Sequence, residues 1–232
     1  MAETPLSAVV VIDYQNVHLT AYDIFNPGGN RHDSLIHPQF FAQTVIRTRN
    51  EHQREGHPSA VLRKAIAFRG LPHTEYDWEQ SRRCSAQAAQ WRADGATVEL
   101  RDLKYPFQRA ADGHPATDIH GHKIPSGPGR EKGIDVLVAL TCLRQALLEE
   151  VDLVILASRD TDLVPVLDTL IDMRSQDPTV AKIETTSWYD REAKRQKRFD
   201  GGSIRPGRGM RVWNTNLDRG CYEASLDRND YN

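Results

Sequence analysis

The chain of 232 residues lacks the features that mark secreted, metal-ribbon or membrane proteins. Its three cysteines, Cys84, Cys142 and Cys221, form no C-x-x-C pair, which argues against a zinc ribbon or a redox motif. No apolar stretch is long enough to span a bilayer, and residues 1–7 lack the basic start and apolar core of a signal peptide. Because an odd number of scattered cysteines fits a reducing compartment, we expect a cytoplasmic protein with no membrane partner.

Charge of one sign is also scarce over the chain as a whole. With 30 basic and 32 acidic residues the net charge is −2, so a polyanion would have to be held by a local patch or by metal ions. Basic residues do gather in one segment: residues 191–211 contain eight Lys or Arg and two acids. The glycines and prolines in the second half of that segment argue against regular structure there.

Apolar runs alternate with helical patterns along the chain. Residues 8–12 are continuously apolar and β-branched, which is typical of a strand buried on both faces of a parallel sheet. Further strands are predicted at 60–68, 97–103, 152–157 and 180–188, and helices at 39–52, 76–93, 133–150 and 163–173. This alternation predicts an α/β, doubly wound fold, with a mostly parallel central sheet of about five strands and helices on both faces. We expect the first and fourth predicted strands to be neighbours.

Two segments interrupt this alternation. Residues 105–132 are rich in Gly, Pro and His with little periodicity, and a loop of that length is usually functional or mobile. The basic segment 191–211 is followed by a short strand predicted at 210–213.

Four aspartates fall where a ligand site of an open α/β sheet is expected. Asp13 ends the first strand, Asp160 and Asp162 follow the fourth, and Asp135 interrupts an apolar helix. Neighbouring carboxylates repel one another unless a cation neutralises them. Mg²⁺ and Mn²⁺ prefer oxygen ligands, activate water and stabilise charge on a phosphodiester. The pattern therefore indicates metal-dependent hydrolysis of a phosphodiester.

Each of these carboxylates also has a structural interpretation. Asp162 would be a favoured N-cap for the helix that begins at Leu163. Asp13 could bind loop amides at the end of its strand, and Asp135 could lie on the exposed side of its helix. Function is favoured because all four fall where a single cleft is expected.

Three short segments add a family resemblance. Residues 12–16 read I-D-Y-Q-N, residues 132–136 read K-G-I-D-V, and residues 158–165 read S-R-D-T-D-L-V-P. In order and spacing they resemble the I-D-x-x-N, K-G-V-D-V and S-G-D-x-D-F-x-P motifs of NYN domains, the PIN-like nuclease group that includes the LabA-type proteins. The resemblance covers roughly residues 8–190. We expect an NYN/PIN-like domain over 1–190, with 191–232 as a basic connector and a C-terminal strand and tail packed on it.

The resemblance implies a ribonuclease with an acidic metal site. By motif, Asp13, Asp135, Asp160 and Asp162 carry over as catalytic ligands of Mg²⁺ or Mn²⁺. Asn16 carries over as a catalytic polar residue that orients Asp13 or a metal-bound water.

The basic residues expected to bind RNA come from the motifs and from the basic segment: Lys132, Arg159, Arg195, Lys197 and Arg198. Arg159 departs from the motif, which has glycine at this position, and could grip a phosphate or obstruct the site. A second departure is Thr141, which stands where many relatives have a further acid.

Other functions stay open at this point. One is a catalytically inactive PIN-like module that binds RNA or a protein, and another is a Mg²⁺-dependent phosphatase that uses the same carboxylates. A homo-oligomer is a further open possibility. A zinc site at His114, His120 and His122 is disfavoured by their spacing and by the lack of a nearby cysteine.

Overall fold

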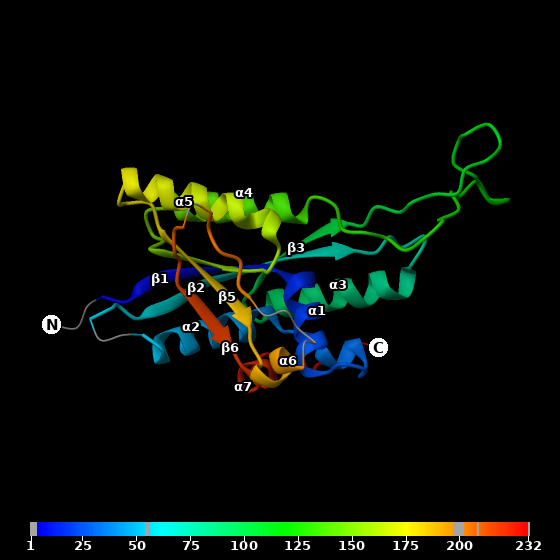
Figure 1. Ribbon diagram of the computed structural model, residues 1–232. Helices are drawn as coiled ribbons and strands as arrows, with labels where there is room; N and C mark the ends of the chain where they lie inside the picture. The colour runs from blue at the N-terminus through cyan, green and yellow to red at the C-terminus, as the bar shows by residue number, and fades with distance from the viewer. Residues whose placement is uncertain (1–3, 54–55, 197–201, 208, 232) are drawn as a thin grey trace.

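The structure, a computed structural model, describes residues 4–53, 56–196, 202–207 and 209–231 around a single sheet (Figure 1). Its strands are β1 Leu6–Asp13, β2 Ala60–Leu71, β3 Thr97–Asp102, β4 Leu153–Ala157, β5 Lys182–Trp188 and β6 Asn214–Leu217. Every neighbouring pair is parallel, and the order is β3-β2-β1-β4-β5-β6. This order is that of a doubly wound sheet, so the predicted fold class is confirmed.

The sheet has six strands rather than the expected five, and the last strand lies later than predicted. The apolar residues before it, 210–213, suggested a strand, but pairing with β5 starts only where the Trp213 carbonyl accepts from Thr185 N (2.9 Å). The polar β6 is held instead by this edge and by side-chain hydrogen bonds from Asn214 to Ser187 (3.2 Å). Apolar patterning cannot locate a strand of this kind.

Helices cover both faces of the sheet. They are α1 Tyr14–Phe25, α2 Pro38–Glu51, α3 Trp78–Ala93, α4 Ile134–Ala146, α5 Val164–Gln176, α6 Arg191–Arg195 and α7 Arg219–Ser225, with short 3-10 turns at Arg31–Ser34 and Thr161–Leu163. Helices α4 and α5 lie on one face, and α1, α2, α3 and α7 lie on the other (Figure 1). The sequence patterns had not predicted α1 or α7.

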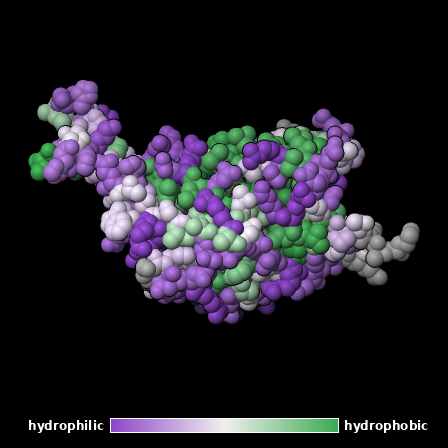
Figure 2. Space-filling view, turned by 180° about the vertical axis from the view of Figure 1, so that it is seen from behind, coloured by the Kyte–Doolittle hydropathy of each residue, from purple (hydrophilic) through white to green (hydrophobic). Residues whose placement is uncertain are grey.

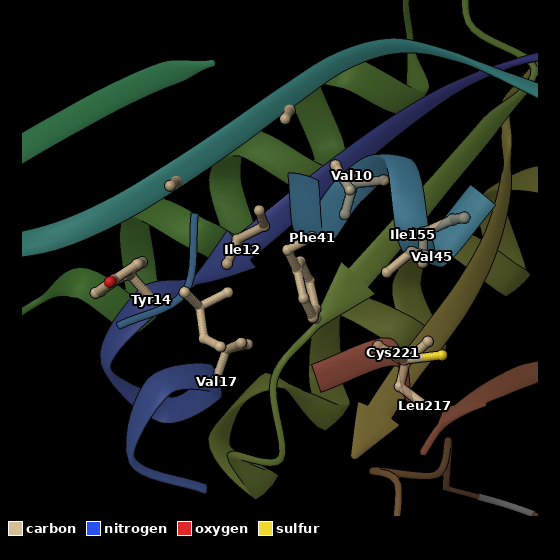
Figure 3. Packing of buried hydrophobic residues seen from close by; sticks show 14 of the residues in the cluster. Val10, Ile12, Tyr14, Val17, Phe41, Val45, Ile155, Leu217 and Cys221 are labelled. Carbon is tan, nitrogen blue, oxygen red and sulfur yellow. The ribbon is translucent and has the colours of Figure 1, made fainter. Parts of the chain in front are cut away.

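The core explains the uninterrupted apolar run of β1. Val10 and Ile12 pack towards Phe41 and other residues of the α2 side, as Figure 3 shows, while Val9 and Val11 pack under α4 and α5. All four valines and isoleucines of the run are almost fully buried. A strand buried on both faces has no polar face, as predicted for the centre of a parallel sheet.

The outer side of α4 is less covered than its inner side. Val138 and Cys142 are buried against the sheet, whereas Val136, Leu140 and Leu147 are more than half exposed. Figure 2 shows hydrophobic side chains gathered on the upper part of the molecule, where α4 lies. None of the helices described combines the length and the apolarity needed to cross a membrane.

The segment expected to be a long loop is an arm that pairs with itself. Antiparallel bridges join Lys104 to Arg130 and Phe107 to Pro125, and two smaller turns close further along the arm. It leaves the sheet after β3, extends away from the domain and returns at the start of α4 (Figure 1). Its conformation rests on backbone pairing, which the sequence pattern did not reveal.

Candidate functional site

The candidate site lies where the strand order reverses. Strand β1 pairs with β2 on one side and with β4 on the other, so the connections leave in opposite directions from this point. The predicted adjacency of the first and fourth strands is thereby confirmed. Ligands of doubly wound proteins bind at such a switch point, beyond the carboxyl ends of the strands. Asp13 ends β1 there, and residues 158–162 follow β4.

Asp13 is the most buried carboxylate of this edge. It is 7% exposed, its Oδ2 accepts from Ser158 Oγ (2.8 Å), and its Oδ1 accepts from Asn16 N (3.4 Å), which caps α1. It forms no ion pair with any residue that the structure describes. Burial raises the pKa of Asp13, the Ser158 and Asn16 hydrogen bonds lower it, and the charges of Asp160 and Asp135 raise it further.

Asp160 is coupled to Asp13 through a shared hydroxyl. The Ser158 side chain donates to Asp13 and accepts from Asp160 N (3.1 Å), and Asp160 Oδ1 accepts from Asp162 N (2.9 Å) at the turn before α5. Asp135, in the first turn of α4, is half-buried. Asp162 is exposed, and the capping role that sequence suggested for it belongs to Asp160.

The expected four-carboxylate ligand set is not assembled. Within the described ranges, no group of three or more Asp, Glu, His or Cys side chains converges as a metal site. The reason is local: Asp13 and Asp160 each turn one oxygen towards a backbone amide at the start of a helical segment rather than towards a common point. Asp135 and Asp160 are nevertheless close enough to Asp13 for their charges to raise its pKa.

Glu131 is a site residue that sequence reasoning missed. Its Oε1 accepts from Gly70 N (2.6 Å), and its Oε2 accepts from the Gln15 side-chain nitrogen (2.7 Å) when that amide faces it. Burial raises the pKa of Glu131, and the negative charge of Asp13 raises it further. The hydrogen bond from the Gly70 amide and the positive charge of Arg69 lower it, but the net shift is upward. Its place directly before the 132–136 motif was a signal, but Glu131 lies in the segment 105–132, which was predicted to be a functional or mobile loop with no periodicity to single it out.

A glycine makes room for this carboxylate. A Cβ at Gly70 would lie 2.3 Å from Leu103 Cδ2 and 2.8 Å from Glu131 Cγ. Real Cβ atoms essentially never show such distances, so a larger residue would force Leu103 and Glu131 to shift, and glycine lets them lie this close to β2.

The catalytic role expected of Asn16 stays a prediction, and the structure gives its side chain a second contact. Its Oδ1 accepts from Arg159 N (2.9 Å), so its side chain holds the loop after β4 and only its backbone amide reaches Asp13. The Arg159 Nε in turn donates to Gly202 O (3.1 Å), which links the site to the segment after residue 201.

The remaining predicted residues are spread more widely. Lys132 is exposed directly before α4, and Arg195 is exposed in α6, where it pairs with Glu192 (3.5 Å). Lys197 and Arg198 lie outside the described residues. Thr141 is buried in α4 and adds no acid to the site.

Comparison with known proteins leaves the family open. No protein-family model matches the chain, and no curated protein matches it. Among solved structures, the chain is similar to the crystal structure of a protein of unknown function from Vibrio parahaemolyticus RIMD 2210633, with a TM-score of 0.46, 17% identity and coverage of 98% of this chain and 99% of that one. The NYN resemblance therefore stays a prediction.

Proposed function

We propose that this protein is a metal-dependent ribonuclease whose site is centred on Asp13. One observation carries the proposal: Asp13 is a buried carboxylate at the switch point of the sheet, beside other carboxylates, with no cationic partner among the described residues. A buried charge is costly unless it is paired. A bound cation would supply that pairing where a ligand is expected.

The donor set suits a hydrated Mg²⁺ or Mn²⁺ better than a fully caged ion. Mg²⁺ usually keeps several waters and takes only one or two carboxylates, so Asp13 with Asp160 or Asp135 would suffice. Such an ion, when bound, supplies an activated water and neutralises charge on the phosphodiester. This arrangement replaces the four direct ligands that the motifs had suggested.

The residues around Asp13 would hold it in place for this task. The Ser158 hydroxyl and the Asn16 amide each bind one oxygen of Asp13, so its orientation is set before a ligand arrives. Lys132, three residues before Asp135, and Arg159, directly before Asp160, would contact the phosphate that the acids repel.

A covalent mechanism through Ser158 has no support. Its hydroxyl is buried and donates to Asp13 while accepting from Asp160 N, so its hydrogen-bonding capacity is used. No histidine of the described chain hydrogen-bonds to it, and a serine nucleophile needs such a base.

The test is a cleavage assay on single-stranded and structured RNA, with single-stranded DNA as a further arm. We expect cutting with Mn²⁺ or Mg²⁺ and none with EDTA. Asp13→Asn and Asp160→Asn should each lower the rate at least about a hundredfold, because loss of groups that only support a metal already costs 10–100-fold. Asp23→Asn, an exposed aspartate of α1, is the matched control and should keep the wild-type rate.

Cleavage at the wild-type rate by both variants, or in EDTA, would refute the mechanism. Phosphate release from mononucleotides without RNA cleavage would indicate the phosphatase instead. RNA binding without cutting would indicate the inactive module, which is favoured by Arg159 and Thr141, the two departures from the motifs.

A further inference from the structure

A cavity of about 520 Å³ lies at the edge of the sheet, separate from the carboxylates. The ends of β5 and β6 form one side of it, and residues from 202–206 and 210–212 form the other. Its volume is in the range of sites that hold small ligands, roughly 300–1,000 Å³.

The segment that closes this cavity is anchored to the domain. Ile204 is buried in the core under α5, and Gly207 N donates to Asp168 Oδ1 of α5 (2.7 Å). A Cβ at Gly207 would lie 2.9 Å from Asp168 Oδ2, so glycine permits this close approach. These contacts hold Arg205 and its neighbours over the strand ends.

Three cations and no acids line the cavity, as far as the described residues go: Lys194, Arg205 and Arg211. Arg205 and Arg211 are exposed, and neither forms an ion pair with a described residue. Unpaired cations converging on one cavity favour an anionic ligand.

The floor of the cavity is polar and ordered. Asn214 Nδ2 donates to Ser187 Oγ (3.2 Å) and to Asn216 Oδ1 (2.9 Å), so three side chains from two strands form one hydrogen-bonded row. Such groups can accept and donate hydrogen bonds to a sugar or a base edge.

An aromatic ring stands beside the cations. Tyr189 is 36% exposed, and Lys194 Nζ lies 6.0 Å from the centre of its ring. An exposed tyrosine next to cations suits an unpaired base that stacks while its phosphate is neutralised.

One residue, Arg159, contacts both the cavity and the carboxylate site. Arg159 follows β4, donates through its backbone to Asn16 and through Nε to Gly202, and Gly202 lines the cavity. A single strand lying over Arg159 would therefore meet both places.

We propose that this cavity binds one nucleotide unit of a single-stranded RNA whose next phosphodiester lies at Asp13. Arg205 and Arg211 neutralise its phosphate, Tyr189 stacks on its base, and the Ser187–Asn214–Asn216 row binds its polar edge. This assignment rests on the proposed ribonuclease function and names the place where the substrate is held. Arg195, one of the basic residues expected from sequence, is not among the described residues that line the cavity. Lys197 and Arg198 lie outside the described residues.

The test measures binding, not cleavage. A fluorescent single-stranded RNA of about ten nucleotides is titrated by anisotropy at several salt concentrations, with every variant carried in the Asp13→Asn chain so that the probe stays intact. We expect Arg205→Gln with Arg211→Gln to weaken binding at least about tenfold. The double variant should also reduce the salt slope by about 0.7, the contribution of one neutralised phosphate on a single strand.

Matched variants make the result specific. Arg82→Gln with Arg228→Gln removes the same charge from exposed arginines outside the cavity and should change neither affinity nor slope. Tyr189→Ala should weaken binding about fivefold or more, and Tyr189→Phe should retain it because the ring remains.

Two outcomes would overturn the inference. RNA binding with an unchanged salt slope in the Arg205/Arg211 variant would show that the strand avoids the cavity, and the ribonuclease function would stand. Arginine-dependent binding of adenosine monophosphate without RNA binding would make the cavity a free-nucleotide site. Because RNA would then not bind at all, this outcome would also contradict the proposed ribonuclease function.

Discussion

Glu184 and Asp13 are both buried carboxylates of the same sheet, but their surroundings differ. Glu184, in β5, is 1% exposed and accepts from Arg49 Nε (2.7 Å) and Nη2 (3.0 Å), with Lys182 Nζ at 2.9 Å. Asp13 has a hydroxyl, an amide and neighbouring carboxylates. The fold thus neutralises Glu184 with its own cations and leaves the charge of Asp13 to a proton or to a bound ion.

The paired Glu184 and the unpaired Asp13 also differ in where they lie in the sheet. Glu184 faces Arg49 of α2 in the interior, near the start of its strand, whereas Asp13 stands at the carboxyl end of β1. A fully paired interior carboxylate maintains structure, and an unpaired one at the ligand-binding edge is a candidate for chemistry.

The largest effect is expected from breaking the structural pair. Arg49→Met leaves Glu184 buried with only the half-exposed Lys182 as partner, so the free energy of unfolding should fall by about 3–5 kcal/mol. Denaturation in urea, followed by circular dichroism, measures it. Arg49→Met with Glu184→Leu should recover most of the loss, because no buried charge then remains. A loss below about 1 kcal/mol in the single variant would contradict the comparison.

A smaller effect is expected from adding the cation that we propose binds at Asp13. Because a ligand that binds only the folded state stabilises it, Mn²⁺ at a hundred times its dissociation constant should add about 2.7 kcal/mol. Thermal melting with and without Mn²⁺ measures this independently of any cleavage. The shift should disappear in Asp13→Asn and persist in Asp23→Asn. A full shift in Asp13→Asn would place the ion elsewhere.

The smallest effect is the pH dependence of Asp13 itself. Because its folded pKa is raised above 3.8, the folded state holds the proton more tightly than the unfolded state. Below pH 3.8 Asp13 is protonated in both states, so the raised pKa does not lower the free energy of unfolding. As the pH rises from there through the folded pKa, stability is lost, and above it the loss is constant. Asp13→Asn should therefore gain stability relative to the wild type across that interval.

Comparing the unfolding free energies of the wild type and of Asp13→Asn at each pH cancels the contributions of the other titratable groups. Burial lowers the pKa of His18 to about 4, so the fold loses stability as the pH falls from 6.5 towards 4. Both chains share this loss, and it cancels in their difference. A difference between the two unfolding free energies that stays flat with pH would show that Asp13 carries no penalty.

Much of the framework could be predicted because it depends on local pattern. The apolar run of β1 indicated a strand buried on both faces, and the rule for parallel sheets placed Asp13 and Asp160 at one edge. Helix α1 and strand β6 were missed because their sequences carry polar residues such as Asn16 and Asn214 that obscure the periodicity. Glu131 was missed because its partner Gly70 is 61 residues away in the chain.

The sequence by itself determined the order of the elements, the all-parallel interior and the acidic residues at the strand ends, because these follow from hydrophobic periodicity and chain connection. Only the tertiary structure decided which carboxylate receives a cation. Arg49 and Glu184 are 135 residues apart, and Ser158 and Asp13 are 145 apart. The cost of a buried charge depends on the groups that packing brings within hydrogen-bond distance, and that distance is set by the whole fold.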